Sequence, residues 1–135
     1  MKDLQTIATL GVGAFGKVTL VKHRQALYAL KSIRKGHVVS TNMLRHVTRE
    51  REAMKQLSSP FTVNLVATLQ DRDNVYMLLE RVMGGEFFTL LHNLEEAPSE
   101  KHVRFYAACV IEVRARAPPP PSRGRVCACG TQAWR

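Results

Sequence analysis

Hydrophobic and polar residues alternate through the first third of the chain, as they do in β-strands that bury one face. The alternation predicts strands at residues 6–10, 17–22 and 26–33, and two more at residues 62–69 and 75–80. The last two are separated by the polar run Asp71-Arg72-Asp73-Asn74, whose residues favour a turn. We therefore expect two groups of strands with a different kind of segment between them.

Helical spacing, with apolar residues three or four positions apart, occurs at residues 42–57, 86–94 and 99–113. The last of these segments begins with Ser99 after Pro98, and serine is a favoured residue at a helix N-cap. The order of the elements predicts an α+β fold, in which a five-stranded antiparallel sheet with one inserted helix is followed by further helices.

The composition is that of a globular protein, with 45% hydrophobic and 23% charged residues among 135. The net charge of +9 is unevenly distributed, because residues 114–135 contain five arginines and no acidic residue. A nucleic-acid-binding face would place its excess charge on the folded part, so we expect no nucleic-acid partner. Three cysteines with no paired spacing predict neither a disulfide framework nor a metal site. With no apolar targeting or membrane-spanning segment at its start, the chain is expected to be cytoplasmic.

The sequence changes character at residue 114. Residues 114–135 contain four consecutive prolines, at positions 118–121, and no apolar period. Proline lacks a backbone donor and favours extended structure, so we expect this tail to be disordered. The alternative is that the tail is a proline-rich ligand for a recognition domain.

A glycine-rich segment, Gly11-Val12-Gly13-Ala14-Phe15-Gly16-Lys17-Val18, has three interpretations. A dinucleotide-binding fingerprint needs a helix directly after it and an acidic residue about 20 positions later, and neither is found. A P-loop also needs a following helix, and a serine or threonine where this chain has Val18. The third interpretation is the nucleotide-covering loop of a protein kinase, which lies between two strands, as this segment is predicted to do.

Two charged residues support the third interpretation. Lys31 ends the apolar run Tyr28-Ala29-Leu30, and Glu50 shares a predicted helix face with Val47 and Met54. A carboxylate on an apolar face is costly to bury unless a cation pairs with it, and Lys31 is the natural candidate. The alternative is that Glu50 only borders the solvent-exposed surface of the helix.

With these motifs in order, residues 10–110 resemble the small lobe and first large-lobe helices of a serine/threonine protein kinase. The chain is most similar to the cyclic-GMP-dependent kinases, in the cyclic-nucleotide-dependent (AGC) group. The matching motifs are Ala29-Leu30-Lys31-Ser32-Ile33, Tyr76-Met77-Leu78-Leu79-Glu80 with Gly84-Gly85-Glu86, and Arg104-Phe105-Tyr106-Ala107-Ala108-Cys109-Val110. Residues 1–82 would form the ATP-binding small lobe and residues 83–113 the hinge and first large-lobe helices.

The resemblance implies a role for each matching residue. Lys31 would bind the α- and β-phosphates while it is paired with Glu50, and these two are the catalytic residues that the chain contains. Leu79 would limit access to the back of the pocket, and Glu86 would bind the ribose hydroxyls. The implied ATP-binding residues are Leu10, Gly11, Val12, Gly13, Ala14, Phe15, Gly16, Val18, Ala29, Lys31, Leu79, Glu80, Val82 and Glu86.

The family also uses an Asp as the base and an Asp and Asn to hold Mg²⁺, in His-Arg-Asp and Asp-Phe-Gly segments that these 135 residues do not contain. We therefore expect ATP as the ligand, no Mg²⁺ ligands, and no activity of the chain by itself. The protein substrate implied by the resemblance carries basic residues near its Ser or Thr. The alternative is a non-catalytic ATP-binding or protein-interaction module.

Overall fold

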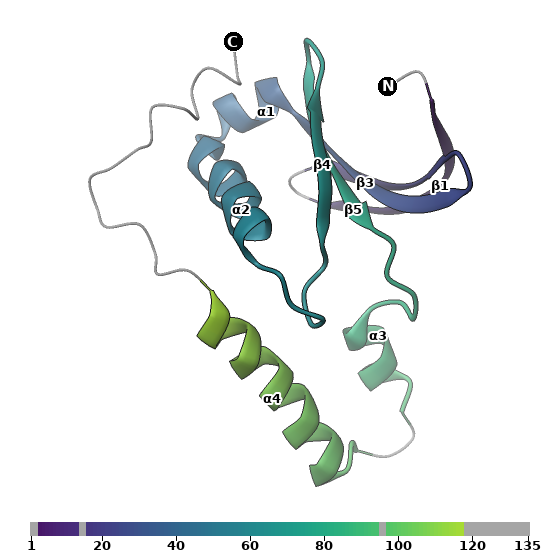
Figure 1. The fold of residues 1–135 in the computed structure, drawn as a ribbon, viewed down its shortest axis with the longest axis vertical. Coiled ribbons are helices and arrows are strands. Elements are labelled where there is room, and N and C mark those ends of the chain that lie inside the picture. Colours follow the sequence, from purple (N-terminus) through teal and green to yellow (C-terminus); the bar gives the residue numbers. More distant parts are fainter. Residues whose placement is uncertain (1–2, 14–15, 95–96, 118–135) are drawn as a thin grey trace.

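The architecture was determined from a computed structural model, which describes residues 3–13, 16–94 and 97–117. Along the chain the elements are β1 (Leu4–Gly13), β2 (Gly16–His23), β3 (Ala26–Arg34), α1 (Lys35–Ser40), α2 (Leu44–Gln56), β4 (Leu65–Gln70), β5 (Asn74–Glu80), α3 (Phe87–His92) and α4 (Glu100–Arg116). The strands form one five-stranded antiparallel sheet in the order β1-β2-β3-β5-β4 (Figure 1). The predicted fold class is confirmed.

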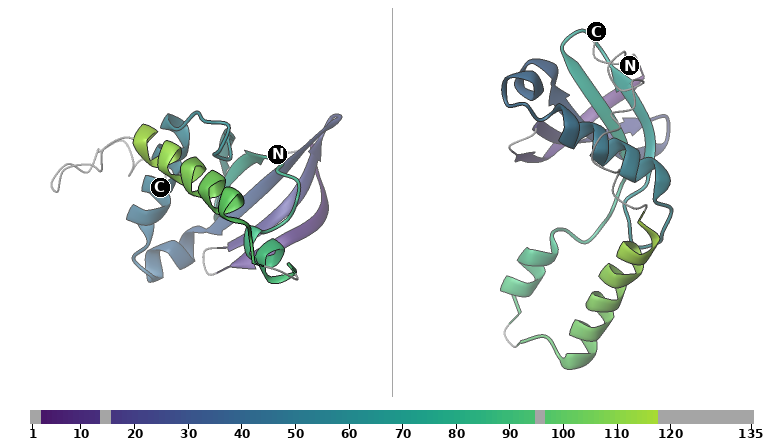
Figure 2. Two further views of the ribbon diagram at one scale, coloured as in Figure 1. Left: turned by 90° about the horizontal axis from the view of Figure 1, so that it is seen from below. Right: turned by 90° about the vertical axis from the view of Figure 1, so that its left-hand side faces the viewer.

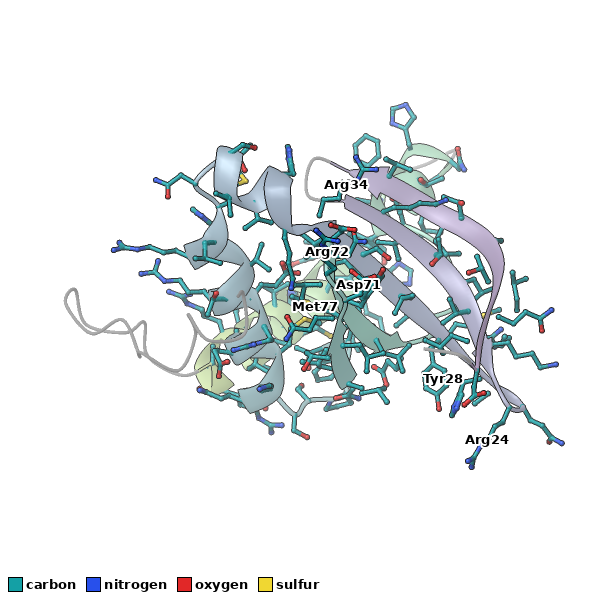
Figure 3. The ribbon with its side chains drawn as sticks, turned by 90° about the horizontal axis from the view of Figure 1, so that it is seen from above. Arg24, Tyr28, Arg34, Asp71, Arg72 and Met77 are labelled. Atoms are coloured by element: carbon teal, nitrogen blue, oxygen red, sulfur yellow. The ribbon has the colours of Figure 1, made fainter. Side chains whose placement is uncertain are left out.

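The hydrophobic core is divided between the two faces of the sheet. On one face, α1 and α2 cover the sheet, and Val38 and Val47 from these helices pack with Ile33 and Met77 from the strands. Figure 3 shows Met77 on the side of the sheet that faces these helices. On the other face, Val21, Leu30 and Leu78 form a second cluster, and residues such as Tyr28 and Tyr76 pack against it. Strands β3 and β5 therefore contribute alternate residues to two separate cores.

Several elements differ from those that the sequence predicts, and β1, for example, runs from Leu4 to Gly13 rather than over residues 6–10. Helix α1 lies within the segment that was expected to contain one helix only, so two helices connect β3 to β4. Strand β4 begins at Leu65 rather than at residue 62, because the amide of Thr62 donates to the carbonyl of Ser59 in a turn. Helix α4 continues to Arg116, beyond residue 113. Arginine and alanine are good helix formers, and Arg116 pairs with Glu112 one turn earlier at 2.6 Å. The rest of the predicted tail, residues 118–135, lies outside the described residues.

The turn between β4 and β5 is held by the carboxylate of Asp71. One oxygen accepts hydrogen bonds from the backbone amides of Asp73 at 2.9 Å and Asn74 at 2.7 Å. The other accepts a hydrogen bond from the hydroxyl of Tyr76 at 2.7 Å. These bonds, that from Tyr76 most of all, lower the pKa of Asp71, and the same hydrogen bond raises the pKa of Tyr76. The predicted turn is therefore present, and one side chain organises it.

Helices α3 and α4 lie beyond one end of the sheet and are connected to it through residues 81–86 (Figure 2). Gly84 and Gly85 in this connection have φ values of 108° and 77°, which glycine adopts without strain. The two helices meet through Phe87 and Tyr106, whose ring centroids are 4.4 Å apart.

Several large apolar side chains of α4 are solvent-exposed, including Phe105, Val110 and Ile111. Among the described helices, none combines the length and the apolar character needed to cross a membrane.

Candidate functional site

The strand register brings four of the predicted ATP-binding residues onto one face of the sheet. Val18 on β2 is paired with Lys31 on β3, and Ala29 on β3 is paired with Leu79 on β5. Because Ala29 and Lys31 are two residues apart on one strand, all four side chains lie on the same face. Lys31 is also paired with Met77, whose side chain is in the core beneath α2. The predicted site therefore adjoins the part of this face that α2 covers.

The glycine-rich segment connects β1 to β2 at the edge of this face. Gly11 is paired with Val18, and Gly13 with Gly16. Gly11 and Gly13 are exposed, and a Cβ atom added to either would contact nothing within 4 Å. Leu10 and Val12 on the same strand are also exposed, with 55% and 78% of their surface accessible. The open space above these residues lets another molecule approach the backbone closely.

Gly16 has a different environment from the other two glycines. Its φ is 142°, and an added Cβ atom would lie 2.0 Å from the carbonyl oxygen of Ser32 on β3. The close approach of β3 therefore requires glycine here for the fold itself. Ala14 and Phe15, the remaining predicted residues of this segment, lie outside the described residues.

The predicted ion pair between Lys31 and Glu50 is present. The Nζ atom of Lys31 lies 2.6 Å from Oε1 of Glu50, and their side chains are 19% and 42% exposed. Val47 and Met54, which flank Glu50 on α2, both contact the core and so turn this side of the helix toward the sheet. Glu50 lies at the border of the apolar face, where water still reaches its carboxylate. The desolvation cost that the sequence argument assumed is therefore smaller than expected.

The last four predicted ATP-binding residues lie at and beyond the end of β5. Leu79 is half-buried and packs against the core beneath α2. Glu80 ends the strand, while Val82 and Glu86 are exposed in the connection to α3. The carboxylate of Glu80 accepts hydrogen bonds from both nitrogens of Asn64, which lower the pKa of Glu80. Sequence reasoning did not identify Asn64, because no motif or periodicity indicates which residue will lie beside the end of β5.

The described residues have two further features that bear on the site. A groove between α2 and the β4–β5 hairpin is lined by residues such as Val47, Arg51 and Gln70, but by none of the predicted ATP-binding residues. Within residues 3–13, 16–94 and 97–117, no group of three or more His, Cys, Asp or Glu side chains could hold a metal ion.

Comparison with known proteins assigns the family. Residues 4–114 match the model of the protein kinase domain. The chain is 43% identical over 113 residues to human cGMP-dependent protein kinase 2, and 41% identical over 115 residues to cGMP-dependent protein kinase egl-4 of Caenorhabditis briggsae. It is 40% identical over 116 residues to cGMP-dependent protein kinase, isozyme 1, of Drosophila melanogaster. These matches cover 82–83% of this chain and 15% of each relative. The described fold is a kinase small lobe with the first helices that follow it, and the chain belongs to the protein kinase family.

Proposed function

We propose that this chain is the ATP-binding part of a serine/threonine protein kinase, whose reaction transfers the γ-phosphate of ATP to protein Ser or Thr. The observation that carries the proposal is the 2.6 Å contact between Lys31 and Glu50 on the face that the glycine segment and β5 border. A lysine that is held by a carboxylate and left partly exposed can bind the phosphates of ATP through its remaining N–H donors.

The residues around this face would contact different parts of ATP, namely its phosphates, adenine and ribose. The backbone of Gly11 and Gly13 would approach the phosphates, since nothing fills the space where their side chains would be. Leu10, Val18 and Ala29 would cover the adenine ring with apolar surface. The backbone of Glu80 and Val82 would contact the polar edge of the adenine, and the exposed carboxylate of Glu86 would bind the ribose hydroxyls.

Phosphoryl transfer also needs groups that these 135 residues do not supply. Mg²⁺ neutralises charge on the transferred phosphate in this family, but the described residues provide no cluster of ligands for it, so we assign no metal position. The base that accepts the proton of the substrate hydroxyl is also absent from the sequence. We infer that these residues bind ATP weakly and do not catalyse transfer by themselves. A protein substrate with basic residues near its Ser or Thr, and a cytoplasmic location, stay predictions.

A second candidate function is a non-catalytic interaction module. The exposed apolar residues of α4, with Phe105 58%, Val110 69% and Ile111 67% accessible, favour contact with a further protein surface. This function does not require ATP, so a measurement of nucleotide binding separates the two proposals.

The test is isothermal calorimetry with ATP on the parent chain and on Lys31→Ala. We expect Lys31→Ala to weaken ATP binding at least about tenfold, because a charged donor to the phosphates contributes roughly 1.5–3 kcal/mol. Lys22→Ala, which removes an exposed lysine near the far end of β2, is the matched control and should bind ATP as the parent does. Equal binding by Lys31→Ala and the parent would remove Lys31 from the site.

A further inference from the structure

Asn64 and Glu80 are joined by three hydrogen bonds, although neither lies in the core. The amide of Glu80 donates to the carbonyl of Asn64 at 3.0 Å. In the other direction, the backbone amide of Asn64 donates to Oε1 of Glu80 at 3.0 Å, and Nδ2 of Asn64 donates to Oε2 at 2.9 Å. Both carboxylate oxygens of Glu80 are therefore occupied by a single residue, which immediately precedes β4.

The contact between Asn64 and Glu80 lies where β5 leaves the sheet. Leu79 packs against the core, whereas every residue from 81 to 85 is exposed. Glu80 is therefore the last residue of β5 before the exposed connection to α3. On one side it is held by its pairing with Tyr28 on β3, and on the other by Asn64. Residues 81–86, which connect β5 to α3, are not paired with any strand of the sheet.

The contact is poorly suited to stabilise the fold as a whole. Its side-chain hydrogen bonds are solvent-exposed, and exposed polar pairs contribute little to the free energy of unfolding. The bond from the Glu80 amide fixes the peptide group that precedes Glu80, and the two bonds to its carboxylate hold the Glu80 side chain against the residue before β4. An arrangement of this kind is expected where the backbone has to meet a ligand in one orientation.

We propose that Asn64 is a positioning residue for adenine, in that its hydrogen bonds hold the Glu80 backbone where it can contact the 6-amino group of ATP. The proposal rests on the proposed function, since it requires that ATP binds along the end of β5. Asn64 itself does not touch the nucleotide. Its effect should therefore appear in the selectivity between nucleotides that differ only in that amino group.

The experiment compares the parent chain with Asn64→Asp, which keeps the size of the side chain, removes its N–H donors and places a second negative charge beside Glu80. Asn93→Asp, on the exposed residue that follows α3, makes the same change of atoms and charge away from the sheet. Binding of ATP and of purine riboside triphosphate, which lacks the 6-amino group, is measured for each protein by NMR titration. The exchange rate of the Glu80 amide hydrogen is measured in the same samples without nucleotide.

We expect Asn64→Asp to weaken ATP binding about three- to tenfold, the cost of one misplaced neutral hydrogen bond, and to leave purine riboside triphosphate binding unchanged. The Glu80 amide should exchange faster in Asn64→Asp and at the parent rate in Asn93→Asp. Asn64→Lys, which returns a donor to the Glu80 carboxylate, should recover the preference for ATP.

Equal loss for both nucleotides would give Asn64 a structural role only and would overturn the proposal. An unchanged ATP preference or an unchanged Glu80 exchange rate in Asn64→Asp would also overturn it, while the proposed function stands. If the parent binds neither nucleotide, the proposed function fails, and the role of Asn64 in binding adenine fails with it.

Discussion

The substitution Gly16→Ala should destabilise the fold, whereas Gly13→Ala, in the same segment, should not. An alanine Cβ at Gly16 would lie 2.0 Å from the carbonyl oxygen of Ser32. Real Cβ atoms essentially never approach another heavy atom closer than 3.0 Å, so β2 and β3 would have to separate by about an ångström. The φ of 142° at Gly16 is also one that residues with a side chain rarely adopt.

The magnitude follows from these two effects. A non-glycine residue in such a backbone conformation costs about 1–3 kcal/mol, and forcing excess atoms into a packed region costs about 1–3 kcal/mol more. We therefore expect Gly16→Ala to lower the free energy of unfolding by roughly 2–6 kcal/mol. At Gly13 an added Cβ meets nothing within 4 Å and the backbone is not at positive φ, so the change should stay within about 1 kcal/mol.

The assay is urea unfolding of the parent and the two variants, followed by circular dichroism of the sheet. Gly13→Ala controls for the loss of backbone freedom that any Gly→Ala change brings. If Gly16→Ala unfolds within about 1 kcal/mol of Gly13→Ala, the close approach of Ser32 does not constrain this position and the reasoning is refuted.

Two further predictions follow from the turn at Asp71 and from the missing catalytic groups. Tyr76→Phe should raise the pKa of Asp71 back toward 3.8, because the hydrogen bond from the Tyr76 hydroxyl is the main cause of its lowering. The pKa of Asp71 is measured by NMR titration, with Tyr28→Phe as the control, and an Asp71 pKa that is the same in Tyr76→Phe as in the parent would contradict the prediction. Since the folded-state pKa of Asp71 is the lower one, its contribution to stability is present above pH 3.8 and is lost as the pH falls through the lowered value, and Tyr76→Phe should diminish this acid-induced loss. The purified 135-residue chain should transfer no phosphate from radiolabelled ATP to a basic Ser/Thr peptide, and transfer that disappears in Lys31→Ala would show that the absent Asp residues are dispensable.

The sequence predicted the elements whose patterns are local and regular. The strands alternate in hydrophobicity, and their turns contain residues that favour turns. Helix α1 was missed because its six residues include Gly36 and two β-branched valines, which are poor helix formers. The burial of Val38 against Ile33, Val47 and Met77, a tertiary contact, compensates for this poor propensity. Short helices that depend on such contacts leave little periodic signal.

The candidate site divides in the same way. The pairing of Lys31 with Glu50 could be predicted, because a carboxylate on the apolar face of a helix is costly to bury without a cation, and Lys31 lies at the end of a predicted apolar strand. The contact between Asn64 and Glu80 could not be predicted, because it depends on which residue before β4 lies beside the end of β5. The register of these strands shifts between Leu65 and Ala67, and an alternating pattern does not reveal where such a shift occurs.

The strand order described above also constrains the sequence of events during folding. Strands β1, β2 and β3 are joined by short connections, so they can assemble from contacts between near neighbours along the chain. Strand β5 is the last to be synthesised but occupies the place between β3 and β4. Its pairing with β3 closes a long loop that contains α1, α2 and β4, and the entropy of that closure is lost before the core beneath α2 is complete. Strand β4 pairs with β5 alone, so the edge of the sheet nearest α2 forms only after β5 has arrived.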